Sequence, residues 1–250
     1  MKQVAARKKK KRRNRTLAQD NRQTACGPID ETIAKRLEET VMEIVSGGRT
    51  AAQALELALA AIIWADQLVA RFEAENRLPQ ALACQPGCHF CCHNQVELTP
   101  PEALLLGDYV EKNFSDDEKQ ALAASLERSV KIRAGKNKKE IAHIRRELPC
   151  PLLKGRKCAV YPVRPLVCRA MHAFDAGHCE AALNSPDLIS DEYYAHRQVF
   201  TMSVVQGLRG GCQKMGCQSA SLDLARALRD FFGQPRPTER WIQGEKVFGS

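Results

Sequence analysis

Apolar residues recur at helical spacing in the first part of the chain, just after residue 30. Ile33, Leu37 and Val41 follow Asp30, an aspartate of the kind that caps helix N-termini, and Ser46-Gly47-Gly48 marks an end. The pattern predicts a helix from Asp30 to about Ser46.

A second and longer helix follows. Thr50 and Gln53 have the spacing of a capping box, and helical spacing of apolar residues continues to about Glu75. The most apolar stretch, Leu57 to Ala65, has nine uncharged residues, whereas a bilayer span needs about 20. We therefore predict that residues 30–80 form an N-terminal helical pair that belongs to a core, with no membrane partner.

Capping signals predict two more helices in the middle of the chain. Thr99 to Glu102 combines a cap, two prolines and an acid at the start of one helix. Ser115 and Glu118 form another capping box, which begins a helix to about Arg133. The polar residues 135–140 are typical of a loop.

The last third of the chain carries the same kind of signal. Residues 141–147 fit a short helix, Ser185 with the proline after it predicts a long helix towards Leu208, and Ser221 is expected to cap a last amphipathic helix. We expect the helices of residues 184–250 to pack on the same domain as the segment before them.

Strand signals are few and short. Residues 95–99 alternate weakly, and residues 150–161 fit two brief strands around a turn at Lys154 to Lys157. The predicted fold is therefore mainly α: a helical domain with irregular Cys-rich loops and one small β-hairpin.

The charge of the chain is concentrated at its beginning. Residues 1–15 hold nine Lys or Arg and no acid, and residues 16–250 hold 29 basic and 29 acidic residues. Residues 1–29 thus read as a basic disordered arm and linker, which can bind nucleic acid or an acidic partner or can simply be solvated. Because residues 16–30 are polar, no secretory signal follows the arm, and we expect a cytoplasmic protein.

Eleven cysteines are the main chemical signal of the chain. In a reducing compartment, dense cysteines indicate metal binding or catalysis and not disulfides. Two groups contain most of them, a C-x3-C-x2-C-C run and a second set some 60 residues later. The candidate metal ligands are Cys84, Cys88, Cys91, Cys92, Cys150, Cys158, Cys168 and Cys179.

The first group is too crowded for one ion. In a helical turn, the adjacent Cys91 and Cys92 would project about 100° apart, so a single metal does not easily take all four thiolates. We infer two metal sites that share this segment, or one larger cluster. Eight thiolates suit two zinc sites, or a four-Cys iron–sulfur cluster with further thiols beside it.

Five cations accompany the second group, with no acid among residues 150–169. They oppose the negative charge of several thiolates, and we expect them to lower the pKa values of the thiols. The alternative is a solvated turn beside buried, inert cysteines. The cations are Lys154, Arg156, Lys157, Arg164 and Arg169.

In an ordered set of motifs, the chain resembles a known family, the YkgJ-type cysteine-cluster proteins, also called CxxCxxCC proteins. The resemblance covers about residues 84–183, and three residues separate Cys84 from Cys88 where the family name has two, so Cys84 ranks below the other ligands of its group. The motifs are GCHFCCH at 87–93, TPPEALLL at 99–106, CPLL from Cys150, CAVYPVRPLVCR at 158–169 and HAFDAGHC at 172–179.

The resemblance implies a domain over residues 84–183 that binds zinc or iron, including iron held as an iron–sulfur cluster, with a structural, metal-handling or redox role. Some relatives resemble flagellin lysine methylases, so a metal-cluster-dependent protein-modifying enzyme is one alternative. A nucleic-acid-associated zinc protein tethered by the arm is another. Residues 84–91 also fit the C-x3-C-x-aromatic-C pattern of radical S-adenosylmethionine enzymes, but the alternating strands and helices of their barrel are not predicted.

Several residues have weaker signals. His172 and Asp175 lie between two candidate ligands and either bind the metal, support a ligand, or make an ordinary polar contact. Cys212 and Cys217 form an extra pair or remain free thiols, and Cys26 looks incidental. No phosphate loop, dinucleotide fingerprint or nucleophile elbow occurs, so no catalytic residue is assigned.

Overall fold

The computed structural model describes residues 28–185 and 194–249, and this part of the chain is mainly helical. It contains ten α-helices and two short two-stranded antiparallel sheets, which confirms the predicted fold class. The predicted basic arm lies almost wholly outside the described residues.

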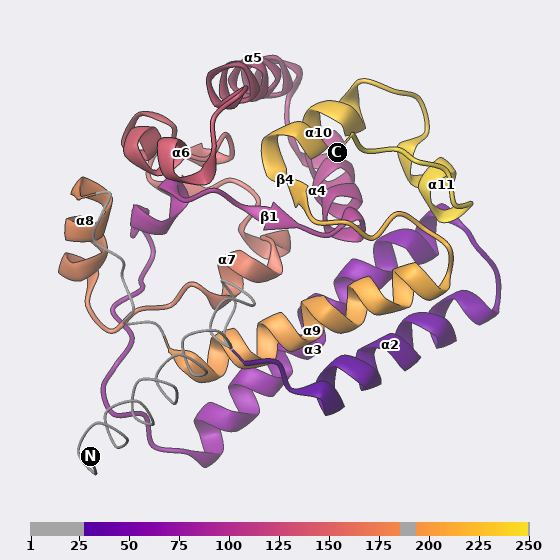
Figure 1. Cartoon of the computed structure of the whole chain (residues 1–250), viewed down its shortest axis with the longest axis horizontal. Helices are drawn as coiled ribbons and strands as arrows, with labels where there is room; N and C mark the ends of the chain where they lie inside the picture. Colours follow the sequence, from indigo (N-terminus) through magenta and orange to yellow (C-terminus); the bar gives the residue numbers. More distant parts are fainter. Residues whose placement is uncertain (1–27, 186–193, 250) are drawn as a thin grey trace, which may run out of the picture.

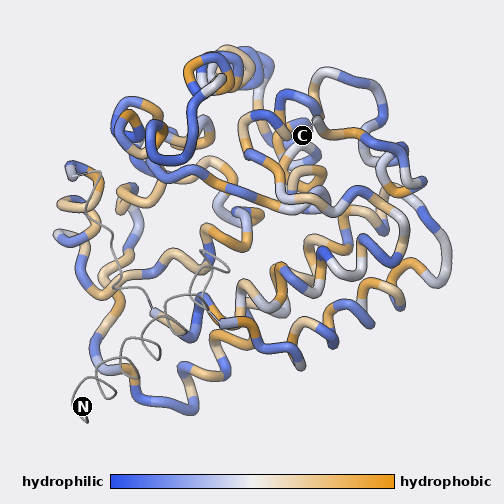
Figure 2. Tube along the Cα trace, in the orientation of Figure 1, coloured by the Kyte–Doolittle hydropathy of each residue, from blue (hydrophilic) through white to orange (hydrophobic). Residues whose placement is uncertain are grey.

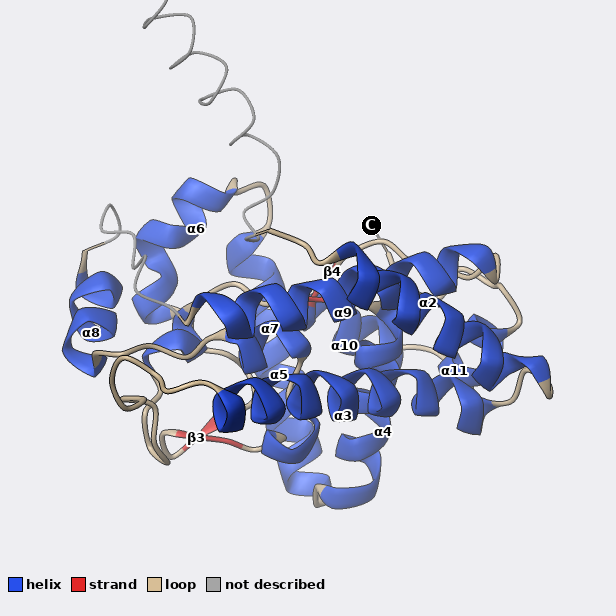
Figure 3. Ribbon diagram, turned by 90° about the horizontal axis from the view of Figure 1, so that it is seen from below, coloured by secondary structure: helices blue, strands red, loops and turns tan. Residues whose placement is uncertain are grey.

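Three long helices form the scaffold of the fold. They are α2 (Glu31–Ser46), α3 (Ala51–Glu75) and α9 (Ala195–Lys214), and they run side by side in both views (Figures 1 and 3). Asp30 caps α2 by accepting the N–H groups of Thr32 and Ile33, and Thr50 and Gln53 form the predicted capping box of α3. Both N-terminal helices therefore begin where the sequence predicts.

Small residues let α2 and α9 pack very closely. A Cβ atom on Gly207 would lie 2.2 Å from the carbonyl oxygen of Ala34, and one on Gly211 would lie 2.6 Å from the Cβ of Val41. No side chain larger than hydrogen fits at either place without a shift of the neighbouring helix. The glycines thus set the distance between two of the three scaffold helices.

The α3 helix is the one helix in the described residues that is long and apolar enough to cross a membrane, judged by length and composition alone. Along the chain, apolar and polar positions alternate around the helices (Figure 2). One side of α3 packs against α2, α4, α9 and α11, and it buries residues such as Leu57, Ala61 and Ile62. These contacts fit the prediction of a core helix.

A second group of helices packs against α3 through two of its members. The group consists of α4 (Pro100–Asn113), α5 (Asp116–Arg133), α10 (Leu224–Phe232) and α11 (Pro237–Ile242). The members that contact α3 are α4 and α11, and α10 packs on α4 and α5. Strand β1 (Glu97–Leu98) pairs with β4 (Leu222–Asp223), and Arg133 forms a 3.0 Å ion pair with Asp223. The pairing joins segments more than 120 residues apart.

The remaining elements are short and carry most of the cysteines. They gather at one end of the scaffold, where α7 packs against α9 and α8 packs against η1 (Figure 1). The elements are η1 (Phe90–His93), α6 (Lys138–Ile144), η2 (Arg145–Glu147), β2 (Leu153–Lys154), β3 (Lys157–Cys158), η3 (Tyr161–Val163), α7 (Leu166–Ala170) and α8 (Ala176–Asn184).

Three predicted boundaries are wrong. Asn137 caps α6, so the predicted loop at 135–140 already contains the start of a helix. Ser185 ends α8, a helix that was not predicted, and the long helix α9 begins at Ala195. Asp223, not Ser221, caps α10, because the residues before it pair with β1.

Candidate metal centre

The cysteine-bearing segments meet around one cavity of about 440 Å³. Its walls come from the loop before η1, from η1 itself, from the β2–β3 hairpin and from α7. Seven of the eight predicted ligands line it: Cys84, Cys88, Cys91, Cys92, Cys150, Cys158 and Cys168. The structure therefore brings together two stretches of chain that are some 60 residues apart in sequence.

Backbone hydrogen bonds fix the first cysteine segment on both sides. The N–H of Cys150 donates to the carbonyl oxygen of Cys92 at 2.7 Å, which joins η1 to the hairpin segment. At the other end, the N–H of Ala83 donates to the carbonyl of Ala173 at 3.0 Å, and the N–H of Ala173 donates to the sulfur of Cys84 at 3.4 Å. The segment 84–92 is thus tied to both later cysteine segments.

A buried carboxylate positions the helix that carries Cys168. Glu102 accepts the N–H of Thr99 at 2.8 Å within its capping box, and it also accepts the N–H of Leu166, the first residue of α7, at 2.7 Å. Burial raises the pKa of Glu102, and the hydrogen bonds from Thr99 and Leu166 oppose that rise. The sequence predicted this glutamate as a helix cap, but its bond to Leu166 could not be read from spacing.

Three of the thiols accept backbone hydrogen bonds in the same local geometry. In each, the N–H two residues further along donates to the cysteine sulfur: Phe90 to Cys88, Leu152 to Cys150 and Val160 to Cys158. Hydrogen bonds of this kind favour the thiolate, which is the form that binds metals. The local backbone therefore fits a metal-binding function for these residues.

Without a metal, burial keeps the thiols protonated. Burial raises the pKa of Cys150 and of Cys179 to about 11 and that of Cys168 well above its usual range, and neighbouring cysteines add to each rise. The Cys91 thiol donates a hydrogen bond to Cys92, and this bond together with burial raises the pKa of Cys91. Metal binding then has to displace these protons, because the thiolate is the ligand.

The predicted effect of the five cations is wrong in its net direction. Lys154 turns away to Glu118 at 3.0 Å, and Arg169 pairs with Asp66 at 2.5 Å. Arg164 does lower the pKa of Cys158, but burial outweighs it. The pKa of this thiol is therefore raised overall, because the loss of water destabilises the thiolate more than the remaining cations stabilise it.

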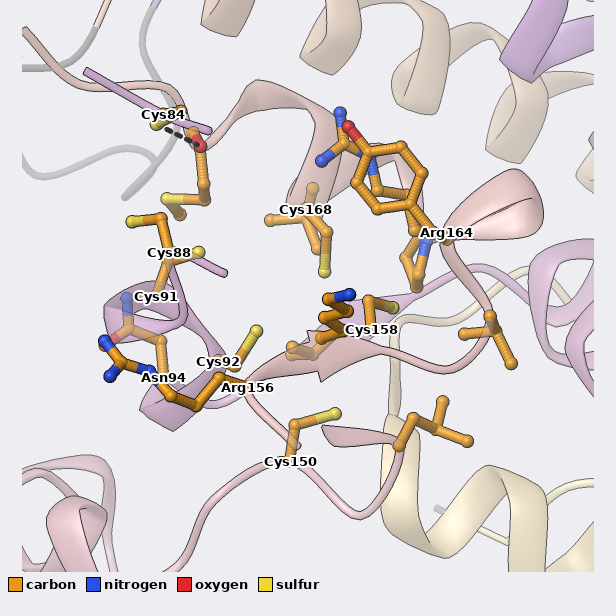
Figure 4. Close-up of a pocket in the computed structure, with 18 of the residues that line it drawn as sticks. Cys84, Cys88, Cys91, Cys92, Asn94, Cys150, Arg156, Cys158, Arg164 and Cys168 are labelled. Atoms are coloured by element: carbon orange, nitrogen blue, oxygen red, sulfur yellow. Dashed lines mark hydrogen bonds between the residues drawn. The ribbon is translucent and has the colours of Figure 1, made fainter. Parts of the chain in front are cut away.

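The thiols fall into two groups. Figure 4 shows Cys92, Cys150, Cys158 and Cys168 around the middle of the cavity, with the other labelled cysteines to one side. The side group is Cys84, Cys88 and Cys91, and the same three residues raise the pKa of Cys179, which lies on α8 outside the cavity lining.

Cys91 lies between the two groups. It raises the pKa of Cys168 as well as that of Cys179, and its own thiol is hydrogen-bonded to that of Cys92. Among the described residues, no three Cys, His, Asp or Glu side chains converge closely enough to hold one metal ion as they stand. Assignment of the eight cysteines as ligands therefore stays a prediction.

The weaker candidates have different surroundings. His172 lines the cavity, with its Nε2 3.4 Å from an Arg164 nitrogen. Asp175 caps α8 by accepting the N–H of Gly177 at 2.7 Å, an ordinary structural role. Cys212 and Cys217 are free thiols that are buried in the hydrophobic core, whereas seven of the eight predicted ligands line the cavity. Cys26 lies outside the described residues.

A polar cluster near the cavity was missed by the sequence analysis. Glu73 at the end of α3 accepts two hydrogen bonds from Arg197, at 2.6 and 2.7 Å, and faces His196 at 2.9 Å. These residues have no characteristic spacing, so only the packing of α3 against α9 brings them together.

Residues 83–198 match the family model CxxCxxCC, described as "Putative zinc- or iron-chelating domain". This segment is therefore similar to the CxxCxxCC family. The CxxCxxCC domain contains all eight cavity and side-group cysteines and confirms the resemblance seen in the motifs. It supports metal binding, with zinc or iron as the metal.

Comparison with curated proteins and with solved structures gave no match. The alternative readings, a protein-modifying enzyme and a nucleic-acid-associated protein, are not tested by the family match and stay predictions. The radical S-adenosylmethionine reading finds no support in the fold, because the described residues form only two-stranded sheets and no partial barrel.

Proposed function

We propose that the chain is an iron–sulfur protein whose cluster is held by the central thiols of the cavity. The proposal rests on how far apart the thiols lie in space. Seven thiols surround a cavity of about 440 Å³, and no three described ligand side chains converge on one point. A single zinc ion needs four ligands within about 2.3 Å of one centre, whereas a cluster of several atoms binds thiolates that are further apart.

The central thiols would hold this cluster, and the side group would form a second thiolate site. The proposed cluster ligands are Cys92, Cys150, Cys158 and Cys168. The second site would use Cys84, Cys88, Cys91 and Cys179, with Cys91 next to Cys92 in sequence and in contact with it. The four-and-four division follows the groups in Figure 4, and Cys84, Cys88 and Cys91 all raise the pKa of Cys179. Cys91 also raises the pKa values of Cys150, Cys158 and Cys168, in keeping with its place between the two groups.

The role we propose is redox together with structure. A bound cluster takes up and releases an electron, and hydrogen bonds to its sulfur ligands raise its reduction potential. In this chain, the backbone N–H groups of Leu152 and Val160 supply such bonds, and Arg164 supplies positive charge. The same ligands would hold together loops that have little regular structure. Free thiols of this density imply a reducing compartment, and we propose the cytoplasm.

The test is metal analysis of the full chain purified without oxygen. We expect iron and acid-labile sulfide in comparable amounts, with broad absorption near about 400 nm that bleaches on reduction. Colourless protein with stoichiometric zinc and no sulfide would overturn the iron–sulfur proposal and leave a structural zinc protein in its place.

Two cysteine variants make the test residue-specific. Cys158→Ala removes a proposed cluster ligand and should abolish the visible absorption. Cys212→Ala removes a cysteine from the hydrophobic core and should leave iron, sulfide and absorption unchanged. Equal loss in both variants would mean that the absorption reports folding and not ligation.

A further inference from the structure

Two buried nitrogen atoms in the cavity wall lack a partner among the described residues. They are Nδ1 of His172, a residue that is only 9% exposed, and Nε of Arg164. Both residues line the cysteine cavity. A buried N–H group without an acceptor costs about 1–3 kcal/mol, so such a pair calls for an acceptor in the cavity.

The proton positions of His172 follow from its neighbour. A nitrogen of the Arg164 guanidinium lies 3.4 Å from Nε2 of His172, and a guanidinium only donates. The facing nitrogen must therefore accept, and the neutral ring carries its proton on Nδ1. If the ring were turned over, the same argument would leave the other nitrogen as the free donor. Either way, one N–H of His172, a residue that lines the cavity, has no acceptor.

The charges next to His172 leave Arg164 without a carboxylate partner. Arg197 is held by the carboxylate of Glu73 at 2.6 and 2.7 Å, so that pair is neutral. Arg164 has no carboxylate within ion-pair distance in the described part of the chain, and instead lies 4.4 Å from the ring of Tyr161. Arg156 and Lys157 line the same cavity, so its wall is positively charged, and the two N–H groups without an acceptor lie on Arg164 and His172.

We propose that the cavity binds a small monocarboxylate between Arg164 and His172, beside the metal centre. The planar guanidinium matches a carboxylate in shape and charge. Several thiolates beside the site repel a multiply charged ion such as phosphate more strongly than they repel a monoanion. Val160, Val167 and Met171 in the same wall supply apolar contact for a short hydrocarbon body. This inference deepens the proposed function, because it names a class of ligand that would bind beside the proposed iron–sulfur cluster. It therefore rests on that proposal.

The test uses butyrate as the probe on the full, metal-loaded chain, with butyramide as its neutral counterpart. Titration calorimetry and the cluster absorption should show saturable butyrate binding, at least tenfold weaker binding of butyramide and of inorganic phosphate, and a small spectral shift. Absence of saturable butyrate binding, or equal binding of butyramide, would overturn the inference.

Variants assign the binding to the two residues. Arg164→Gln and His172→Phe should each weaken butyrate binding at least tenfold. Arg156→Gln is the matched control, because Arg156 lines the same cavity but directs its Nε to His89 at 3.3 Å. Iron and sulfide are measured for each variant, and circular dichroism checks that it folds.

The outcomes separate the two proposals. Weakened butyrate binding with full iron content supports the carboxylate site. If Arg164→Gln instead loses iron, and the intact protein does not bind butyrate, then Arg164 serves only the thiolates and the inference fails. Butyrate binding that persists in a protein that contains zinc and no iron would refute the iron–sulfur proposal alone.

Discussion

The scaffold helices and the cysteine region are built on different principles. Capping side chains begin α2 and α3, and glycine contacts hold α2 against α9; each of these acts over a few residues or across one helix pair. In the cysteine region, single hydrogen bonds link distant loops, and free thiols line the space between them. We therefore expect the scaffold to stay folded without a ligand and the cysteine region to need one.

We expect metal removal to have the largest effect on local stability, and we expect that effect in the cysteine region and not in the scaffold helices. Metal binding to thiolate sites contributes on the order of 10 kcal/mol to the folding of loop-rich regions. After treatment with a chelator and a reductant, amide exchange should become at least tenfold faster in residues 84–93 and 150–179. The amides of α2, α3 and α9 should stay protected. Uniform loss of protection would show that the two regions fold as one unit.

Gly211→Ala should damage the scaffold and spare the metal centre. The new Cβ would lie 2.6 Å from Val41, so α2 and α9 must move apart, at a cost of about 1–3 kcal/mol. Urea unfolding measures the change, and iron content should be the same as in the unmodified protein. Gly47→Ala is the control, because nothing lies within 4 Å of its Cβ position. Equal effects of the two variants would refute the close-packing argument.

Glu102→Gln tests the link between the two regions. The amide replaces a carboxylate that accepts the N–H groups of Thr99 and Leu166, so a buried donor loses its acceptor, at a cost of about 1–3 kcal/mol. We expect lower stability and faster metal loss, because α7 carries Cys168. Glu140→Gln changes the matching, exposed capping-box acid of α6 and should leave metal retention as it was. If both variants keep their metal equally well, the Leu166 bond does not position α7.

His172 predicts a smaller, pH-dependent effect. Burial and the charges of Arg197 and Arg164 lower the pKa of His172 from 6.5 to about 4. Between these values the unfolded chain takes up the proton and the folded protein does not, so stability falls as the pH falls from about 6.5 to 4. His172→Phe should reduce this slope in urea titrations in a buffer free of carboxylic acids. An unchanged slope would mean that other groups carry it.

The sequence predicts a helix start well where the capping signal is local. Asp30, Thr50 and Ser115 cap helices within three residues of themselves, and all three act as predicted. Ser221 fails because a strand partner 124 residues away, Glu97, draws its neighbours into a sheet. A pairing of this range leaves no periodic trace in the chain.

For the candidate site, the sequence could name residue types but not their surroundings. The cysteine spacing and the family motifs picked out the eight thiols, seven of which line one cavity. Spacing could not show that Lys154 and Arg169 turn to distant carboxylates, or that His172 and Arg164 face each other. Those facts depend on how the loops fold back on one another, which only the three-dimensional arrangement contains.

The contact between Cys91 and Cys92 has a consequence for how this domain can change. One peptide bond separates a residue assigned to the side group from one assigned to the central group, and their thiols touch. A cut between these two residues separates Cys84, Cys88 and Cys91 from Cys179, because all four proposed cluster ligands lie between Cys91 and Cys179 in the sequence. If both groups bind metal as proposed, no continuous segment can carry the second site into another protein without carrying the cluster ligands with it.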